Sequence, residues 1–253
     1  MRRFSFIITL MVVISCKNRK EETIFKSWKS YPPPEQYTAQ QYNQEFQDWI
    51  VYKVEDSIKV TLDRIDAEKQ FPFKIETNND AYSKFGGHKS FIATDDGYLA
   101  GFFRGEFGGN LWWFSKDGKE SYEIGEYQLV GFAKRDNKIY AIEGLAHLGL
   151  SGGNLLEIIK ENNKWVAKKY LDLREAPLGI DVDSRDNIIV MTSTKILAID
   201  NTKKIDTLVY RGFWYPYLYP TSLVIKNNIL YSGMRRGVYK YNLDSGNEEW
   251  LMK

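Results

Sequence analysis

The chain contains few of the residues on which most enzyme classes depend. Its 253 residues include one cysteine and two histidines, so no disulfide can form within it and a zinc site is poorly supported. No Lys-Ser/Thr pair follows its paired glycines, and no Gly-x-Ser-x-Gly segment occurs. These absences argue against a phosphate-binding loop and a serine nucleophile elbow. We therefore expect neither a metal nor a cofactor.

Charge and hydropathy exclude two further classes. Lys and Arg number 35 and Asp and Glu 33, giving a formal net charge of +2, and no basic cluster lies beyond the first few residues. A nucleic-acid-binding protein needs a basic face that neutralises phosphates, so we expect no nucleic-acid partner. After residue 15 no apolar run is long enough to cross a bilayer as a helix.

The single cysteine, Cys16, follows a basic start and a short apolar run that ends at Ser15. This leader resembles the signal peptide and lipobox of bacterial lipoproteins, in which the cysteine is lipidated and becomes the first residue. The alternative is an ordinary buried thiol. The resemblance implies a signal peptide over residues 1–15 and a membrane partner reached through the lipid. Because Lys17 rather than aspartate follows the cysteine, the resemblance also implies the outer membrane of the cell envelope. It does not say whether the protein faces the periplasm or the cell surface.

A change in amino-acid composition and pattern divides the remaining chain. Residues 17–45 are polar and contain three consecutive prolines that begin at Pro32. This composition predicts a tether. Together with the lipidated cysteine, it forms one segment over residues 16–45. From Phe46 to Lys253 short β-rich runs alternate with tight turns. We predict one β domain over residues 46–253.

A repeat runs through this domain. An apolar strand, an acidic or asparagine turn and a second apolar strand recur at Asp56, Asp96, Asn137, Asn187 and Asn228, with spacings of 40, 41, 50 and 41 residues. Four of these units carry a second hairpin, which predicts four antiparallel strands per unit and so the blades of a β-propeller. The 208 residues suit five blades of about 42 residues, the first atypical. A β-sandwich or a shorter β-meander is the alternative.

Two sets of connections differ in character. If strands A to D run outward from the propeller axis, the A-B and C-D turns lie on one rim and the B-C and D-A loops on the other. The first set is short and polar, whereas the second is long, glycine-rich, aromatic and charged. Because long loops on a rigid scaffold commonly carry function, we predict a binding rim formed by His88, Arg104, Glu106, Glu143, His147, Trp214, Tyr215, Tyr217, Tyr219, Arg235 and Arg236.

Three stretches in this domain are EFGGNLWWFSKDG, EGLAHLGLSGG and LYPTSLVIKNNILYSGMRRGVYK. They resemble a group of bacterial propeller-like proteins, many of them secreted or lipid-anchored, over about residues 32–253. The resemblance implies the fold and no catalytic residue.

Two functions fit these observations. The first is a ligand- or protein-binding module of the cell envelope that acts through the binding rim, with a protein, a glycan or another small molecule as partner. The second is an envelope hydrolase or lyase on a sugar- or peptide-derived substrate, with Glu106 or Glu143 and His147 as an acid-base pair. The same Glu and Arg side chains often form structural ion pairs between blades, and the aromatic loop 213–220 can equally fill space between blades. We therefore favour binding.

Overall fold

The computed structural model describes residues 23–67, 71–75 and 83–253. In that part of the chain, antiparallel strands form four sheets of four or five strands and one separate hairpin, and the helices are short. The predicted all-β class is confirmed. The predicted signal peptide and Cys16 lie outside the described residues.

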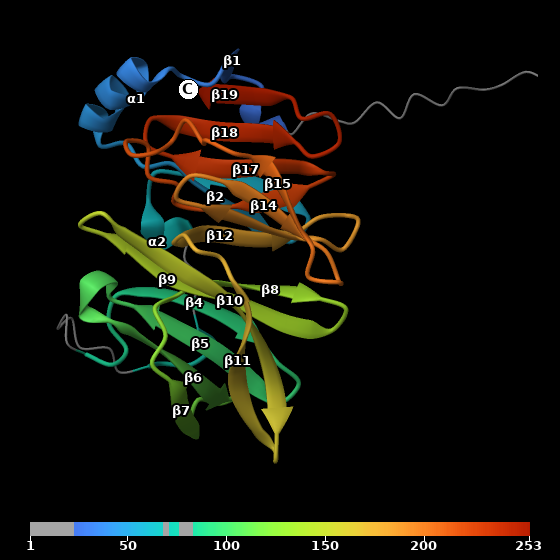
Figure 1. The fold of residues 1–253 in the computed structure, drawn as a ribbon. Coiled ribbons are helices and arrows are strands. Elements are labelled where there is room, and N and C mark those ends of the chain that lie inside the picture. The colour runs from blue at the N-terminus through green and yellow to red at the C-terminus, as the bar shows by residue number, and fades with distance from the viewer. Residues whose placement is uncertain (1–22, 68–70, 76–82) are drawn as a thin grey trace, which may run out of the picture.

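The four larger sheets follow one another along the chain, and in each the strands pair in chain order (Figure 1). The first sheet contains β4 (His88–Ala93), β5 (Gly97–Phe103), β6 (Gly109–Ser115) and β7 (Ser121–Gly125). The second contains β8 (Leu129–Arg135), β9 (Lys138–His147), β10 (Leu150–Glu161) and β11 (Lys164–Asp172). The third contains β12 (Pro177–Val182), β13 (Ile188–Thr192), β14 (Ile196–Ile199) and β15 (Ile205–Val209). The fourth contains β16 (Val224–Lys226), β17 (Ile229–Met234), β18 (Gly237–Asn242) and β19 (Glu248–Met252).

The first strands of these sheets face a common axis. Strand β8 contacts both β4 and β12, and β12 contacts β16. Successive four-stranded antiparallel sheets whose innermost strands meet in this way form a β-propeller, so the predicted fold is confirmed.

The first unit is smaller than the others, as predicted. It consists of the hairpin β2 (Ile50–Val54) and β3 (Ser57–Thr61), which packs on β16 and β17, followed by α2 (Arg64–Ala67). Phe71 and Phe73 then pack against the aromatic cluster of the next sheet, where the ring centroids of Phe71 and Phe91 are 4.4 Å apart. Since the described residues of this unit supply two strands, the count of five blades stays a prediction.

The prediction of a free tether is wrong for residues 23–45. This segment forms η1 (Thr23–Phe25), β1 (Lys29–Tyr31), α1 (Gln36–Tyr42) and η2 (Asn43–Glu45). Strand β1 pairs with β19, with Lys29 opposite Met252, so the segment extends the fourth sheet to five strands. There are two physical reasons. The edge strand β19 has unpaired backbone groups that β1 satisfies, and the polar segment carries isolated apolar side chains that pack on the propeller. Phe25 is 6% exposed and stacks on Tyr231 at 5.3 Å.

The short polar turns behave as predicted. Asp136 and Asn137 have φ of 50° and 62°, and Asn227 and Asn228 have 52° and 59°. Two consecutive residues with positive φ characterise the type I′ turn, whose twist matches that of the flanking strands. These two turns connect β8 to β9 and β16 to β17, so the long connections of these sheets are left at the other ends of the strands.

Candidate functional site

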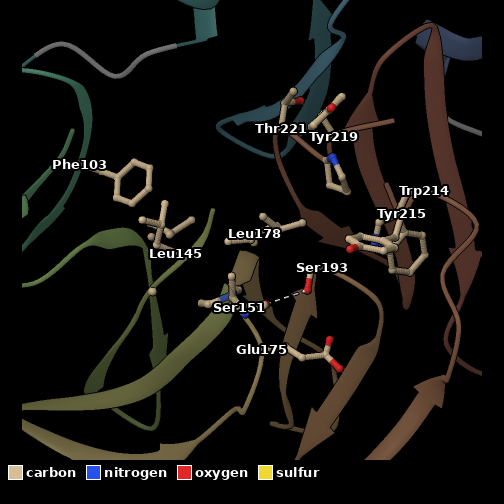
Figure 2. Close-up of a pocket in the computed structure, with 18 of the residues that line it drawn as sticks. Phe103, Leu145, Ser151, Glu175, Leu178, Ser193, Trp214, Tyr215, Tyr219 and Thr221 are labelled. Atoms are coloured by element: carbon tan, nitrogen blue, oxygen red, sulfur yellow. Dashed lines mark hydrogen bonds between the residues drawn. The ribbon is translucent and has the colours of Figure 1, made fainter. Parts of the chain in front are cut away.

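The long connections surround a cavity of about 1060 Å³ at one end of the axis (Figure 2). Strand residues of the first three large sheets line it, together with loop residues beside β16 and β17 of the fourth sheet and residues next to the first hairpin. Six of the eleven predicted rim residues line it, namely His88, His147, Trp214, Tyr215, Tyr219 and Arg235. A cavity of this size is large enough for a drug-sized ligand.

The walls of the cavity are mostly apolar. Leu145, Leu178 and Phe103 are partly exposed, although all three are large apolar side chains. In Figure 2, Phe103 and Leu145 lie on one side, an aromatic group lies on the other, and Leu178 lies between them. Partly exposed apolar side chains that share a concave surface are characteristic of a ligand-binding pocket.

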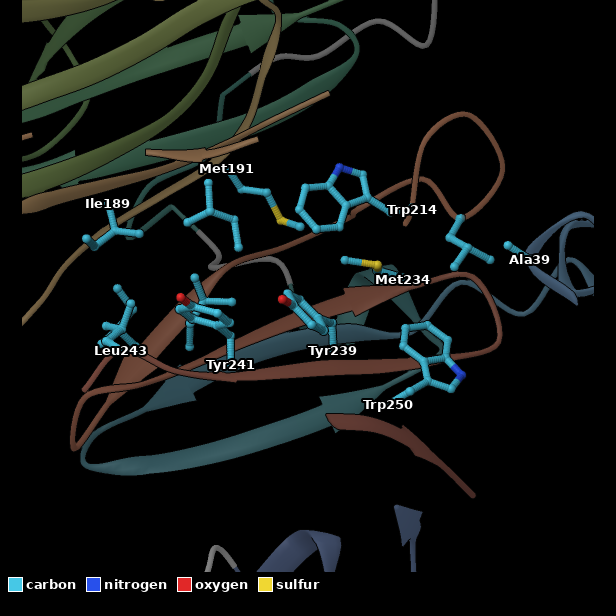
Figure 3. Packing of buried hydrophobic residues seen from close by; sticks show 13 residues of the cluster. Ala39, Ile189, Met191, Trp214, Met234, Tyr239, Tyr241, Leu243 and Trp250 are labelled. Carbon is cyan, nitrogen blue, oxygen red and sulfur yellow. The ribbon is translucent and has the colours of Figure 1, made fainter. Parts of the chain in front are cut away.

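The aromatic loop 213–220 divides its side chains between core and cavity. Trp214 is 1% exposed, donates from Nε1 to the carbonyl of Thr192 at 3.2 Å, and belongs to the cluster of buried side chains shown in Figure 3. Tyr217 packs against the same cluster. Tyr215 and Tyr219 are 55% and 52% exposed and line the cavity. Of the four predicted aromatic residues, these two have surface available to a ligand.

The two predicted rim arginines are held by the N-terminal segment. The Arg235 side chain donates to both carboxylate oxygens of Asp48, at 2.8 and 3.3 Å, and lies between the rings of Phe46 and Tyr219. Arg236 forms an ion pair with Glu45 at 2.7 Å. Arg235 borders the cavity, but its guanidinium is engaged with protein groups.

Glu106 and His147 come together as predicted, with 2.8 Å between Oε2 and Nε2, and both are more than 40% exposed. Glu106 lies in η3 (Gly105–Phe107), and His147 ends β9. His147 lines the cavity, and Glu106 lies outside the lining. The third member of the predicted acid-base group, Glu143, also lies outside it and accepts a hydrogen bond from Asn154.

His147 belongs to an arm formed by the ends of β9 and β10. The pairing of these strands continues to His147 and Leu150, beyond the body of the sheet. Gly144 makes this approach possible, because its φ is 149° and a Cβ there would lie 2.3 Å from the carbonyl oxygen of Gly152. At the tip, Leu148 and Leu150 are 89% and 79% exposed and border the cavity.

The other two predicted rim residues have different surroundings. His88 lines the cavity, and its Nδ1 lies 3.4 Å from Nη1 of Arg64, the first residue of α2. Arg104 lies outside the lining, and it donates to Oδ1 of Asn110 at 2.9 Å and to the carbonyl of Lys84. Arg104 thus holds together the loops that precede β4 and β6.

Glu175 is a cavity residue that the sequence analysis missed. It accepts hydrogen bonds from Thr192 Oγ1 at 2.7 Å and from Thr194 Oγ1 at 2.8 Å, and it forms an ion pair with Lys195. Burial opposes its ionisation, but the bonds from Lys195 and the two threonines outweigh it and lower the pKa of the carboxyl. A single glutamate in a D-A loop carries no motif, and its partners follow about 20 residues later, so no sequence signal marks it.

Groups that could hold a metal or cross a membrane were also sought. Within residues 23–67, 71–75 and 83–253, no three His, Cys, Asp or Glu side chains come together as metal ligands do. In the same residues no helix has the length and apolar character needed to span a bilayer.

No protein-family model and no curated protein sequence matches the chain. Among solved structures, it is similar to an extracellular domain from B. thetaiotaomicron, with a TM-score of 0.47 and 14% identity over 65% of this chain and 22% of that one. For virginiamycin B lyase from Staphylococcus aureus the TM-score is 0.45 and the identity 12%, over 65% of this chain and 55% of that one. For a gluconolactonase from Xanthomonas campestris the TM-score is 0.41 and the identity 11%, over 64% of this chain and 55% of that one. The chain thus spans between a fifth and about half of these proteins, and the fold assignment rests on its own sheet topology.

Proposed function

We propose that this protein is a β-propeller of the cell envelope, anchored at the outer membrane through a lipid on Cys16, that binds a small ligand in its axial cavity. The cavity itself supports this most directly. It is about 1060 Å³ in volume, the first three large sheets and the loops beside the fourth contribute to its lining, and apolar side chains dominate its walls. Apolar walls with a few polar groups are typical of sites that hold a ligand by burial.

The polar side chains of the cavity favour binding over turnover. Arg235 is bound to Asp48, and Glu175 is bound to Thr192, Thr194 and Lys195. Because its pKa is lowered, Glu175 stays ionised at neutral pH, whereas a general acid needs a raised pKa. No convergent set of acid, base and anion-stabilising groups is formed by the described lining residues.

One observation favours the alternative, an envelope hydrolase or lyase. Glu106 and His147 form a carboxylate-imidazole pair at the mouth of the cavity. Such a pair can act in acid-base catalysis where the carboxylate orients the imidazole. Glu143, bound to Asn154, does not join it.

Ligand retention distinguishes the two functions. The full chain and its variants would be purified from the cell envelope, and the small molecules that remain bound would be identified by mass spectrometry. We expect Leu178→Glu to abolish retention, because it places a charge in the apolar wall, and Glu106→Gln to leave retention unchanged. Ile205→Glu is the matched control, since Ile205 lies on β15, outside the cavity lining, and is 38% exposed. Conversion of a retained compound by wild type but not by Glu106→Gln would establish the alternative.

A further inference from the structure

The charged groups of the cavity do not all cancel one another. Four lining side chains are formally charged at neutral pH, namely Asp48, Arg64, Glu175 and Arg235. Asp48 and Arg235 neutralise each other at 2.8 Å, and Glu175 is neutralised by Lys195 from outside the lining. Among the described lining residues, the charge of Arg64 is left over.

Arg64 is exposed and lies at the start of α2. Its Nη1 donates to Nδ1 of His88 at 3.4 Å, and no carboxylate of the described residues pairs with it. A guanidinium has five donors in a planar fork that matches a carboxylate, so most of its hydrogen-bonding capacity faces solvent. The part of the cavity formed by the described residues therefore has one cationic corner.

Apolar surface begins next to this corner. His88 pairs directly with Phe103 across β4 and β5, and Phe103 and Leu145 lie on the same side of the cavity. Leu178 and the exposed ring of Tyr215 continue the apolar surface across it (Figure 2). A ligand with its anionic group at Arg64 would lay an apolar body along these side chains.

The remaining polar groups do not call for a second head group. The Ser151 and Ser193 hydroxyls lie 3.2 Å apart, and Ser151 accepts from the amide of Ala176. Thr194 donates to Glu175, and Thr221 donates to the carbonyl of Trp49. Among the described residues, no lining side chain has a buried polar atom without a partner. The hydroxyls of these four side chains are thus engaged within the protein, and among the described lining residues Arg64 is the charged donor left for an anionic group.

From this arrangement we propose that the ligand is an apolar monocarboxylic acid, its carboxylate held by Arg64 and its hydrocarbon body lying against Phe103, Leu145, Leu178 and Tyr215. The proposal rests on the proposed function, since it names the class of molecule that the axial cavity binds. Its acidic group and its apolar body make separate contributions, which can be measured separately.

Three photoreactive probes test it. Each has the same ten-carbon chain with a diazirine, and they end in a carboxylate, a hydroxyl or an ammonium group. The full chain would be incorporated into phosphatidylcholine vesicles, which carry no net charge, and irradiated with each probe. The labelled residues would be identified by peptide mass spectrometry. We expect the carboxylate probe to label cavity residues about three- to tenfold more than the hydroxyl probe, as a charge-assisted hydrogen bond at a partly exposed site implies, and the ammonium probe to label them least.

Variants separate the two contributions. Arg64→Gln should abolish the preference for the carboxylate probe and leave labelling by the hydroxyl probe unchanged, whereas Arg64→Lys should retain part of the preference. Arg211→Gln is the control, because Arg211 is exposed and lies outside the lining. Equal cavity labelling by the carboxylate and hydroxyl probes in wild type, or an unchanged preference in Arg64→Gln, would overturn the proposed ligand class. Absence of cavity labelling by all three probes would instead overturn the proposed function.

Discussion

Neighbouring residues of the loop 213–220 have opposite roles. Trp214 is packed in the core between the third and fourth sheets (Figure 3), while Tyr215 is 55% exposed at the cavity (Figure 2). The sequence predicts the unusual loop correctly, because five aromatic residues and two prolines in eight positions are conspicuous. It cannot distinguish filler from binding surface, since that depends on which ring meets Tyr239 and Met191 from other sheets.

Alanine substitution separates these roles. Trp214→Ala should lower the free energy of unfolding by about 3 to 5 kcal/mol, because it leaves a large cavity in the core and removes the hydrogen bond to Thr192. Tyr215→Ala should change it by less than about 0.5 kcal/mol and reduce ligand retention instead. Urea denaturation measures the first effect. Comparable destabilisation by both substitutions would contradict the division between core and cavity.

Glu175 gives the cavity a pH-dependent support. The lowered pKa means that its ionised form is stabilised in the folded protein relative to the unfolded chain, where the ordinary value is 4.5. This contribution to stability is present above pH 4.5 and is lost as the pH falls through the lower pKa of the folded state. Acid therefore weakens the wall that Glu175, Thr194 and Lys195 form.

Glu175→Gln should remove this dependence. We expect a loss of about 1 to 3 kcal/mol of stability at pH 7, the contribution typical of a hydrogen-bonded charged group. The difference from wild type should shrink as the pH falls below 4.5, because the carboxyl is then protonated in the unfolded chain and, at its lower pKa, in the folded protein too. Urea denaturation at pH 7 and pH 3 tests this. A difference that stays constant between the two pH values would refute the role assigned to the charge.

Among the elements, hairpins could be predicted from sequence and the N-terminal strand could not. A type I′ turn is determined by two adjacent residues, such as Asn227 and Asn228, and by the apolar strands beside them. Strand β1 has three exposed residues and pairs with β19, which is more than 200 residues later. Local composition therefore predicts a tether, although the free edge of β19 and a place for Phe25 exist only in the folded protein.

Substitutions in this segment measure how firmly it is attached. Phe25→Ala should cost about 3 to 4 kcal/mol of folding stability, since the side chain is 6% exposed and packs on Tyr231. Tyr37→Ala is the control, because Tyr37 lies in α1 of the same segment and is 72% exposed. If both substitutions proved neutral by urea denaturation, residues 23–45 would behave as the tether that composition predicts.

At the scale of the whole molecule, a repeated local pattern predicts the fold, while the cavity depends on side chains far apart in the chain. Repetition of two hairpins about every 42 residues was sufficient to predict a propeller, because each sheet can bury its faces only against another. The pairing of Arg64 with His88 and the neutralisation of Arg235 by Asp48 join residues up to 187 positions apart. No repeat encodes such contacts, so the rim was predicted as a region and its chemistry was not.

Attachment of residues 23–45 to the propeller also changes the expected distance from the membrane. If Cys16 carries the lipid, six residues separate it from Thr23, and the seven Cα-to-Cα steps span at most about 25 Å, whereas a free chain from Cys16 to Phe46 spans up to about 100 Å. The propeller should therefore stay close to the bilayer.

Because Cys16 is the only native cysteine and would be blocked by lipid, Thr23→Cys offers a single site for a fluorescent donor. We expect strong energy transfer from this donor to an acceptor lipid in vesicles, and loss of both membrane association and transfer when Cys16→Ser is added and the donor is attached at residue 23 alone. Weak transfer from a membrane-bound protein would contradict the short spacer, and membrane association that survives Cys16→Ser would contradict the lipid anchor.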